Sequence, residues 1–411
     1  MEKLLRLGLV GFGCRGMGLL EYTIMPLEGK QITVVGVCDA YEDRTQKAAD
    51  KVEELCGRRP QMTQDYREIL KMDIDAVVIM SAWESHIEIA IEAMKAGKIV
   101  ASEVGGAYSI DDCWRLVRTS EETGMPCMLL ENCCYGQREL MVLNMVRKGV
   151  FGEVVHCSGG YMHDLRQEVA DGEENRHYRL RNYLNRNCEN YPTHEIGPIA
   201  KVLNINNGNR MLSLVSVASR SAGLNTFIKD RKGEDDKYAN ARFAQGDIVT
   251  TVITCAGGET ITLTLDTTLP RSYSRGFTVR GTKAAYFEDT DSFFIDHQHN
   301  EFDFAPKKLW DNAESFVEEH QHSIWKDYLP EGGHGGIDGL VFRAFVDAAR
   351  RGTPMPIDVY DMATYMCITA LSEESIAKGG APVAVPDFTN GKWTCREKLA
   401  DGIFALDLVK E

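Results

Sequence analysis

The stretch "VGFGCRG" (residues 10–16) decides the fold of the first part of the chain. It places Gly11, Gly13 and Gly16 in the G-x-G-x-x-G spacing, directly after the apolar run "LLRLGLV" and at the start of a helical pattern. Glycines at these positions permit a tight turn, let backbone N–H groups approach a pyrophosphate, and let the helix pack closely on the strand. The motif in this context predicts a dinucleotide-binding βαβ unit.

The second apolar run, "ITVVGVCD", ends in an acidic residue, Asp39. A carboxylate at the end of the second strand accepts hydrogen bonds from an adenosine ribose diol and repels a 2′-phosphate. We therefore predict that the cofactor is NAD rather than NADP.

Three more apolar runs, "DAVVIMSA", "KIVASEV" and "PCMLLENC", alternate with amphipathic helical segments. Such alternation is typical of a parallel sheet covered by helices on both faces. Ser109, followed three residues later by Asp112, resembles a capping box, and Gly124 provides the end of that helix. We predict an α/β Rossmann domain over residues 1–133.

The pattern changes after residue 133. The runs "EVVHCSGGYMHD", "MLSLVSVAS", "DIVTTVITCAGGETITLTLDTTL" and "GFTVRGTKAAYFED" contain glycine turns that suit antiparallel hairpins. We predict that residues 134–411 form an α+β substrate-binding and oligomerisation domain with an open-faced, mainly antiparallel sheet. The open face would expose apolar area in a monomer, so we expect a homo-oligomer. The polar connection over residues 166–198 is interpreted as a long ordered loop with a functional role.

Composition limits the classes of partner. The chain has 411 residues, 44% of them hydrophobic, and a formal net charge of -15, which argues against binding to nucleic acid or a membrane surface. The first residues lead directly into a strand, and no apolar run reaches membrane-spanning length, so a cytoplasmic protein is predicted. The 12 cysteines are scattered without C-x-x-C pairs, which favours reduced thiols and no metal site.

Two segments, "SAWESH" (residues 81–86) and "SEVGGA" (residues 102–107), follow consecutive strands at the ligand-binding edge of the predicted sheet. Trp83 could be a packing ring and His86 a polar group at a helix start, but their place at this edge favours contact with the cofactor. Glu103 on a buried strand needs a partner, because an unpaired buried carboxylate is costly. A cofactor amide or hydroxyl could provide that partner.

Further motifs run along nearly the whole chain: "WESH", "EVGGA", "ENCCYG", "GGYMHDLR", "NYPTHEIGP", "GGHGG" and "PDFTNGKW". With the glycine motif, they resemble the Gfo/Idh/MocA oxidoreductase superfamily and, within it, the NAD-dependent glycosidases of glycoside hydrolase family 109, typified by α-N-acetylgalactosaminidase. Sugar dehydrogenases of the superfamily carry a catalytic lysine after the glutamate, in an E-K-P motif. Here Val104 and Gly105 follow Glu103, so a different group must take the hydroxyl proton. Two positions depart from that branch: Gly105, where serine is usual, and Gly136, where arginine is common.

The resemblance implies two sets of site residues. Around NAD, besides the glycines, it places Cys14, Arg15, Asp39, Trp83, His86, Glu103, Val104 and Asn132. Around the sugar it places Tyr161, Arg179, Tyr191, Pro192, Thr193, His194 and Tyr273.

The reaction implied by the resemblance is redox-neutral and uses one bound NAD for oxidation at sugar C3, elimination of the aglycone, addition of water and reduction. We expect a glycosidase acting on an N-acetylhexosaminide, with an α-N-acetylgalactosaminide favoured, and without the usual pair of carboxylates. His194 and Tyr161 are the predicted catalytic residues. Histidine ordinarily titrates near neutral pH, and Tyr161 can move a proton if the charge of Arg179 lowers its pKa. Which of the two acts on which proton stays open.

Other interpretations remain. Between Pro192 and Pro198, His194 could serve only to build a turn. A net NAD-dependent sugar or cyclitol dehydrogenase would use His194 in place of the lysine, and a non-catalytic NAD or sugar sensor would keep the fold alone. His334, in "GGHGG", precedes a predicted helix whose start could meet an anion or simply form a loop-to-helix entry.

Overall fold

The computed structural model describes residues 3–300, 302–397 and 402–407 of the chain. They fold into two compact units. Of the described residues, the first unit comprises 3–136, 327–364 and 402–406, and the second comprises 137–300, 302–326, 365–397 and 407. The sequence predicts a single boundary after residue 133, whereas each unit is assembled from separate segments.

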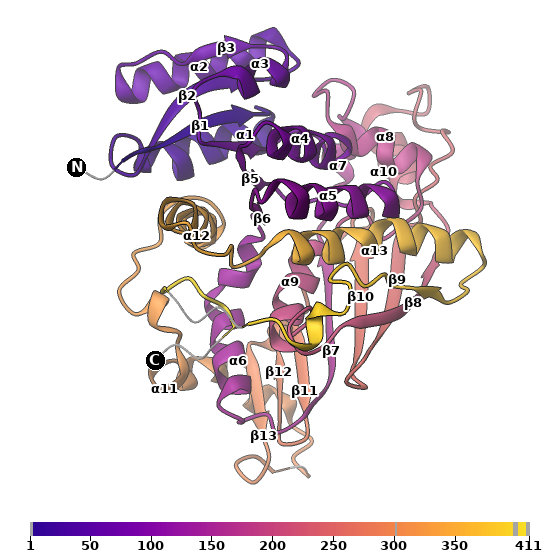
Figure 1. Cartoon of the computed structure of the whole chain (residues 1–411). Helices are drawn as coiled ribbons and strands as arrows, with labels where there is room; N and C mark the ends of the chain where they lie inside the picture. Colours follow the sequence, from indigo (N-terminus) through magenta and orange to yellow (C-terminus); the bar gives the residue numbers. More distant parts are fainter. Residues whose placement is uncertain (1–2, 301, 398–401, 408–411) are drawn as a thin grey trace. The chain divides into compact units, whose positions relative to one another are not determined.

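The first unit contains a six-stranded parallel sheet in the order β3-β2-β1-β4-β5-β6 (Figure 1). The strands are β1 (Leu5–Val10), β2 (Ile32–Cys38), β3 (Gln61–Thr63), β4 (Ala76–Ile79), β5 (Ile99–Ser102) and β6 (Cys127–Leu129). Five of them coincide with the predicted apolar runs, so the Rossmann prediction is confirmed. The short strand β3 is mostly exposed and carries no apolar run, which explains why the sequence did not reveal it.

Helices connect these parallel strands. They are α1 (Cys14–Leu19), continued by η1 (Leu20–Ile24) and η2 (Met25–Leu27), then α2 (Glu42–Cys56), α3 (Tyr66–Lys71), α4 (Trp83–Lys95), α5 (Ile110–Thr123) and η3 (Asn132–Tyr135). The Ser109 hydroxyl accepts a hydrogen bond from the backbone N–H of Asp112 at 3.1 Å, and Gly124 ends α5 with φ of 68°. The predicted N-cap and glycine C-cap of α5 are therefore confirmed.

A later segment of the chain returns to the first unit. It contains η8 (His334–Gly336) and α12 (Ile337–Arg351), which packs against η1, η3 and β1. The helix α13 (Val359–Ala377) contributes residues to both units. Across the described residues, we find no helix with both the length and the apolar character required to span a bilayer.

The second unit is built on an eight-stranded sheet in the order β13-β12-β11-β7-β10-β9-β8-β14. The strands are β7 (Val154–Met162), β8 (Met211–Ala218), β9 (Ile248–Cys255), β10 (Thr260–Asp266), β11 (Thr278–Gly281), β12 (Ala284–Phe287), β13 (Ser292–Ile295) and β14 (Val383–Ala384). Only the β7–β10 pair is parallel among the pairings of this sheet in the described residues. The predicted mainly antiparallel sheet is therefore confirmed.

The helices of the second unit are α6 (Gln137–Arg147), α7 (Arg166–Ala170), α8 (Tyr178–Asn185), α9 (Thr193–Val202), α10 (Gly223–Lys232) and α11 (Val317–His320). Short 3₁₀ turns are η4 (Glu288–Thr290), η5 (Pro306–Lys308), η6 (Asn312–Phe316), η7 (Ser323–Trp325) and η9 (Lys392–Thr394).

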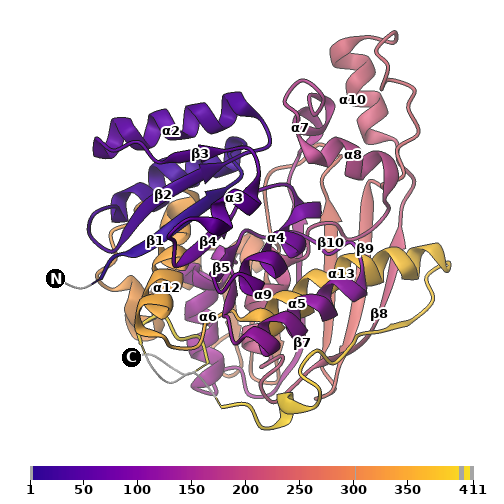
Figure 2. The same ribbon diagram turned by 45° about the horizontal axis from the view of Figure 1, so that its top comes forward.

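The expected long loop over residues 166–198 is wrong in one respect, because α7, α8 and the start of α9 lie within it (Figure 2). Helix α9 buries Ile196 and Ile199 and packs on β7. A Cβ atom on Gly159 of β7 would lie only 3.0 Å from the Cβ of Glu195, so α9 lies close against this strand. Tertiary packing therefore stabilises helices in this segment, and the polar sequence alone does not indicate that packing.

Candidate active site

The glycine loop after β1 has close contacts at two glycines and open space at the third. Gly11 has φ of +101°, and a Cβ atom there would lie 2.5 Å from the carbonyl carbon of Met80. A Cβ atom on Gly16 would collide with the carbonyl oxygen of Gly11. At Gly13 the nearest atom to such a Cβ is a guanidinium nitrogen of Arg44, 3.7 Å away. The loop thus has the tight turn, the close helix packing and the accessible backbone that a pyrophosphate requires.

Asp39 lies just beyond the end of β2 and is buried. One carboxylate oxygen accepts the backbone N–H of Phe12 at 2.6 Å, and the other accepts that of Tyr41 at 3.0 Å. Each oxygen keeps a lone pair for another donor. The carboxylate is therefore fixed beside the glycine loop and can accept the hydroxyls of an adenosine ribose.

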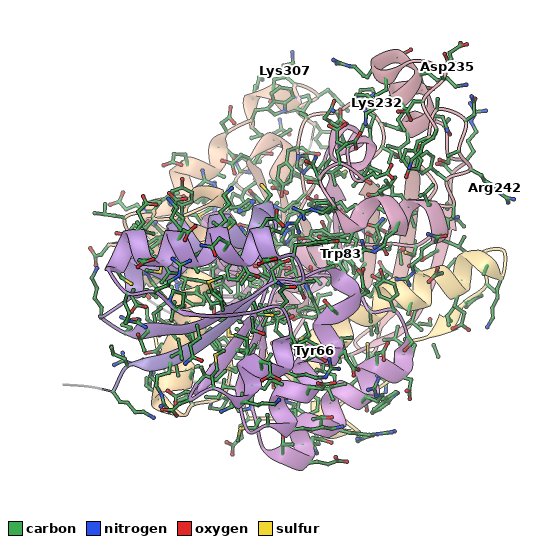
Figure 3. The ribbon with its side chains drawn as sticks, turned by 90° about the horizontal axis from the view of Figure 1, so that it is seen from above. Tyr66, Trp83, Lys232, Asp235, Arg242 and Lys307 are labelled. Carbon is green, nitrogen blue, oxygen red and sulfur yellow. The ribbon has the colours of Figure 1, made fainter. Side chains whose placement is uncertain are left out.

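Trp83 and His86 lie in the first turn of α4, after β4, and both are buried (Figure 3 labels Trp83). The Nε2 atom of His86 lies 2.9 Å from the carbonyl oxygen of Ser81, and burial lowers the pKa of His86 to about 4, which keeps its imidazole neutral at pH 7. A Cβ atom on Gly105 would lie 2.7 Å from Cδ1 of Trp83. The glycine at position 105 thus leaves the space in which the Trp83 ring packs.

A charged network lies at the ends of β5 and β6, and its centre is a residue that the sequence analysis did not select. The buried carboxylate of Asp338, from the first turn of α12, accepts Arg15 Nη1 at 2.6 Å, Arg15 Nη2 at 2.9 Å and the amide of Asn132 at 2.7 Å. His334 Nδ1 lies 2.9 Å from the same carboxylate. Glu103 accepts Arg15 Nη2 at 3.2 Å and Nε at 3.4 Å.

This network changes what can be expected of Arg15 and His334. Arg15 Nη1 also lies 3.2 Å from His334 Nδ1, and the Nε, Nη1 and Nη2 groups of Arg15 all donate to the carboxylates of Glu103 or Asp338. Burial alone would raise the pKa of Asp338, but the hydrogen bonds from Arg15 and His334 outweigh it and lower the pKa. The start of α12 is therefore already occupied by its own carboxylate, which disfavours an anion there.

The other predicted cofactor residues lie in the same unit. Cys14 is exposed and is the first residue of α1, whereas Val104 is buried just after β5. The first unit thus brings together all the predicted NAD-binding residues at the ends of its parallel strands, the edge at which such folds bind ligands. Their role in binding remains a prediction.

In the second unit, the side chains predicted to hold the sugar gather around Tyr161 on β7. The Tyr161 ring centroid lies 4.5 Å from that of Tyr191, 5.7 Å from that of His194 and 6.4 Å from that of Tyr273. The Tyr161 hydroxyl lies 3.2 Å from Nδ1 of His163, as strand alternation allows. The exposed ring of Tyr273 contrasts with the buried rings of Tyr161 and Tyr191.

Arg179 of α8 contacts the same cluster. Its guanidinium carbon lies 5.1 Å from the Tyr191 ring centroid and 5.8 Å from that of Tyr161, and its Nε lies 2.6 Å from the carboxylate of Glu168. Burial raises the pKa of Tyr161 to about 12, although the charge of Arg179 acts in the opposite direction. The condition that Arg179 lowers the pKa of Tyr161 is therefore not met, and the phenol keeps its proton at neutral pH.

His194 lies in the first turn of α9, rather than in a loop. Pro192 is the N-cap residue, Thr193 is the first helical residue and both are buried, while His194 is half-buried. The His194 ring lies 4.9 Å from that of Tyr191, almost perpendicular to it. The structure thus brings the half-buried ring of His194 together with that of Tyr161.

The second cluster combines a protonated phenol, imidazoles and a guanidinium beside aromatic faces. Imidazole and phenol groups can exchange protons with hydroxyls, and aromatic rings pack on the apolar faces of sugars. Two carboxylates of these clusters, Glu168 and Asp338, are not predicted from the sequence. Glu168 lies within the polar segment for which the sequence predicts a loop, and Asp338 follows the "GGHGG" motif by two residues. Only the fold shows that each carboxylate contacts an arginine.

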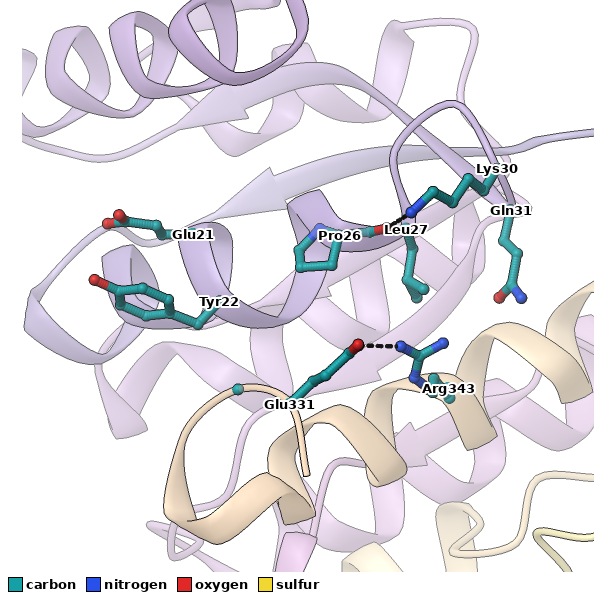
Figure 4. Close-up of a pocket in the computed structure, with 9 residues that line it drawn as sticks. Glu21, Tyr22, Pro26, Leu27, Lys30, Gln31, Glu331 and Arg343 are labelled. Carbon is teal, nitrogen blue, oxygen red and sulfur yellow. Dashed lines mark hydrogen bonds and ion pairs between the residues drawn. The ribbon is translucent and has the colours of Figure 1, made fainter. Parts of the chain in front are cut away.

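A cavity of about 460 Å³ in the first unit involves neither set (Figure 4). Tyr22, Pro26 and Leu27 line it on one side, and Glu331 and Arg343 form an ion pair of 2.7 Å at its edge. None of the predicted site residues lines this cavity.

Two family models match the chain. The model described as oxidoreductase family, NAD-binding Rossmann fold, matches residues 5–130. The model described as glycosyl hydrolase 109, C-terminal domain, matches residues 135–395. Together they confirm the family resemblance and the prediction of NAD as cofactor.

Curated relatives match over almost their full length. The α-N-acetylgalactosaminidase of Tannerella forsythia is 38% identical, with 96% of this chain and 88% of that protein covered. A glycosyl hydrolase family 109 protein of Parabacteroides distasonis is 36% identical with the same two shares, 96% and 88%.

Solved structures share the fold at low identity. Levoglucosan dehydrogenase, in complex with NADH and levoglucosan, superposes with a TM-score of 0.66 at 19% identity, covering 94% of this chain and 100% of that one. An inositol dehydrogenase homologue from Azotobacter vinelandii, complexed with NAD⁺, gives a TM-score of 0.66 at 17% identity, covering 93% and 97%. With the family models and the curated relatives, these matches show that the chain belongs to the glycosyl hydrolase 109 family and is an enzyme that binds NAD through a Rossmann fold.

Proposed function

We propose that the protein is an NAD-dependent glycosidase that cleaves N-acetylhexosaminides by a redox-neutral route. The observation that carries this proposal is the contact cluster of Tyr161, His163, Tyr191 and His194 in a family whose dehydrogenase lysine is replaced here. The cluster offers acid and base groups for sugar chemistry where the position after Glu103 offers none.

The favoured substrate is an α-linked N-acetylgalactosaminide. The support is the 38% identity to the relative named α-N-acetylgalactosaminidase over 96% of this chain. In this proposal Arg179, Tyr191, Pro192, Thr193 and Tyr273 bind the sugar. The buried guanidinium donates hydrogen bonds to its oxygens, and the aromatic rings pack against its apolar face.

Bound NAD supplies a hydride acceptor and returns the same hydride later in the cycle. Gly11, Gly13 and Gly16 would hold its pyrophosphate with backbone N–H groups, and Asp39 would accept its ribose hydroxyls. Cys14, Arg15, Trp83, His86, Glu103, Val104 and Asn132 complete the proposed cofactor site.

We assign His194 as the base and Tyr161 as the acid of the reaction. His194 removes a proton from the sugar, at the C3 hydroxyl or at C2, and Tyr161 donates a proton to the leaving oxygen. This division follows from the raised pKa of Tyr161, about 12, because a phenol that holds its proton can donate it but cannot remove one. His163, at 3.2 Å from the Tyr161 hydroxyl, can return the proton after each cycle.

A glycoside panel tests the proposal. Purified protein is incubated with nitrophenyl α- and β-N-acetylgalactosaminides, α-N-acetylglucosaminide and α-galactoside, while nitrophenol and NADH are recorded together. We expect release of nitrophenol from the α-N-acetylgalactosaminide without net NADH, and uptake of deuterium at C2 in heavy water. Retention of the C2 proton through turnover would rule out the elimination route.

Other outcomes identify the alternatives. Stoichiometric formation of NADH from a free sugar or cyclitol would identify a net dehydrogenase. Solved structures with the same fold are named as a levoglucosan dehydrogenase and an inositol dehydrogenase homologue. Retention of bound NAD without turnover of any glycoside or sugar would identify a sensor.

We also propose that the chain forms a homo-oligomer through the sheet of the second unit. Val252 of β9 pairs directly with Val215 of β8, and Val252 and Val217 are 43% and 53% exposed. Apolar side chains on an exposed sheet face favour association. Light scattering after gel filtration should give a mass above that of one chain, and a strict monomer would contradict this.

A cytoplasmic location is proposed because the twelve cysteines form no disulfides, and cell fractionation can check it.

A further inference from the structure

Two carboxylates in the first unit share one guanidinium. Arg15 donates to Glu103 at 3.2 Å and to Asp338 at 2.6 and 2.9 Å. Both carboxylates are buried, at 6% and 1% residue exposure. Glu103, Asp338 and Arg15 therefore set two negative charges against one positive charge, and both carboxylates are shielded from bulk water.

The place of this charge follows from the topology of the same unit. In the strand order β3-β2-β1-β4-β5-β6, the chain adds β2 and β3 on one side of β1 and β4 to β6 on the other side. Asp39, after β2, marks the side on which the adenosine half would bind. A dinucleotide that crosses the glycine loop must place its other half beside the ends of β4 and β5. Glu103 follows β5 directly, so the network lies on the nicotinamide half.

The nicotinamide ring carries a positive charge in NAD⁺ and none in NADH. A fixed negative charge nearby lowers the free energy of NAD⁺ relative to NADH, and it acts more strongly where water is excluded. We propose that Asp338 and Glu103 set the redox state of the bound cofactor by favouring NAD⁺, with Asp338 acting as a positioning residue through Arg15 and Asn132. The inference rests on NAD binding and is independent of the sugar.

The network also orders the residues around it. Asp338 receives hydrogen bonds from Arg15 in the first turn of α1 and from Asn132 after β6, at 2.6 and 2.7 Å. Asp338 therefore links the segment that follows β1 to the segment that follows β6, although these segments are far apart in the sequence. Loss of Asp338 should therefore weaken both forms of the cofactor somewhat, and NAD⁺ more than NADH.

The test measures the two cofactor forms in competition. Protein is equilibrated with a known mixture of NAD⁺ and NADH until the bound ratio is constant, and the recovered cofactor is quantified after denaturation. For a unit charge about 10 Å from the ring and an effective dielectric of about 20 to 40, Asp338→Asn should shift the ratio about fourfold to fifteenfold toward NADH. Glu103→Gln should shift it in the same direction.

Asp347→Asn is the matched control, because Asp347 lies on the same helix and pairs with Arg351 at 3.1 Å on the surface. We expect no change in the ratio for this variant. If Asp338→Asn fails to fold, Glu103→Gln alone decides. An unchanged ratio in the folded variants, with both forms weakened equally, would overturn the electrostatic role and leave the network as a scaffold. No glycoside is needed, so this result is separate from the fate of the proposed hydrolysis.

Discussion

Replacing Tyr161 by phenylalanine separates its acid role from its packing role. The ring contacts with Tyr191 and His194 remain, and only the hydroxyl that lies 3.2 Å from His163 is lost. If Tyr161 is the acid, we expect kcat for the glycoside to fall by about 10² to 10⁴, the usual range for removal of a general acid. NAD that co-purifies with the variant should be unchanged.

The pH dependence of stability gives an independent magnitude. At pH 8 the variant should lose about 1 kcal/mol of unfolding free energy, the net value of one hydrogen bond. The pKa of Tyr161 is raised from 10.0 to about 12. Between these values the unfolded tyrosine has lost its proton while the folded one keeps it, so the stability of the wild type falls as pH rises, by about 1.4 kcal/mol per unit. The variant lacks this loss, and the two proteins should be about equally stable near pH 11.

Urea unfolding followed by circular dichroism, at pH 8, 10 and about 11, measures both terms. Tyr286→Phe is the matched control: Tyr286 is fully buried and its hydroxyl donates to Asp291 at 3.0 Å, outside the cluster. It should lose stability at pH 8 but keep the wild-type kcat. A constant difference between wild type and Tyr161→Phe at all pH values would refute the burial argument, and an unchanged kcat would refute the acid role.

Three further substitutions test other parts of the site. His194→Ala should lower kcat at least about 100-fold and keep bound NAD, whereas His156→Ala, at the other end of β7 from Tyr161, should change neither kcat nor bound NAD; loss of the fold in His194→Ala would support a turn role for His194. Gly105→Ser should lower the free energy of unfolding by about 1 to 3 kcal/mol, because the new Cβ would lie 2.7 Å from Trp83. Gly18→Ser is the control and should lower it less, because no atom lies within 4 Å of a Cβ there. Equal urea midpoints for the two variants would contradict this. Glu168→Gln should raise KM for the glycoside and lower the free energy of thermal unfolding by about 1 to 2 kcal/mol, because the buried Arg179 guanidinium then faces a neutral amide instead of a carboxylate. The loss stays this small because the Glu168 side chain is 40% exposed, so water screens the ion pair. An unchanged KM would show that Arg179 does not contact the sugar.

The first unit could be predicted from sequence because its signals are local. The glycine loop, Asp39 and the five apolar runs each define an element over a short stretch, and the parallel sheet follows from their alternation. Asp338 could not be found in this way. It lies 323 residues from Arg15, and one aspartate in a helix start looks like any other.

The second unit shows a different limit. Its strands alternate clearly, but α8 and α9 lie within residues 166–198, whose many polar side chains predicted a connection, and both helices are stabilised by the side chains that they bury. The direction of the Tyr161 pKa also depends on tertiary structure. Arg179 does lie beside Tyr161, as predicted, but burial changes the pKa of Tyr161 more than the charge of Arg179 does, and burial depends on the whole fold.

The position of His194 shows how a stretch with two prolines can hold the imidazole that we propose as the base. Pro192 fixes the backbone just before the helix, and Pro198, inside α9, cannot donate the usual hydrogen bond to the preceding turn. The first turn of α9 is held by the hydrogen bond from the Ile196 N–H to the Pro192 carbonyl at 3.0 Å and by the burial of Thr193 and Ile196. Such a turn keeps the His194 ring against Tyr191 while the side chain stays half-exposed. Rigid backbone and accessible imidazole are then compatible, so the structural and reactive interpretations of this histidine no longer exclude each other.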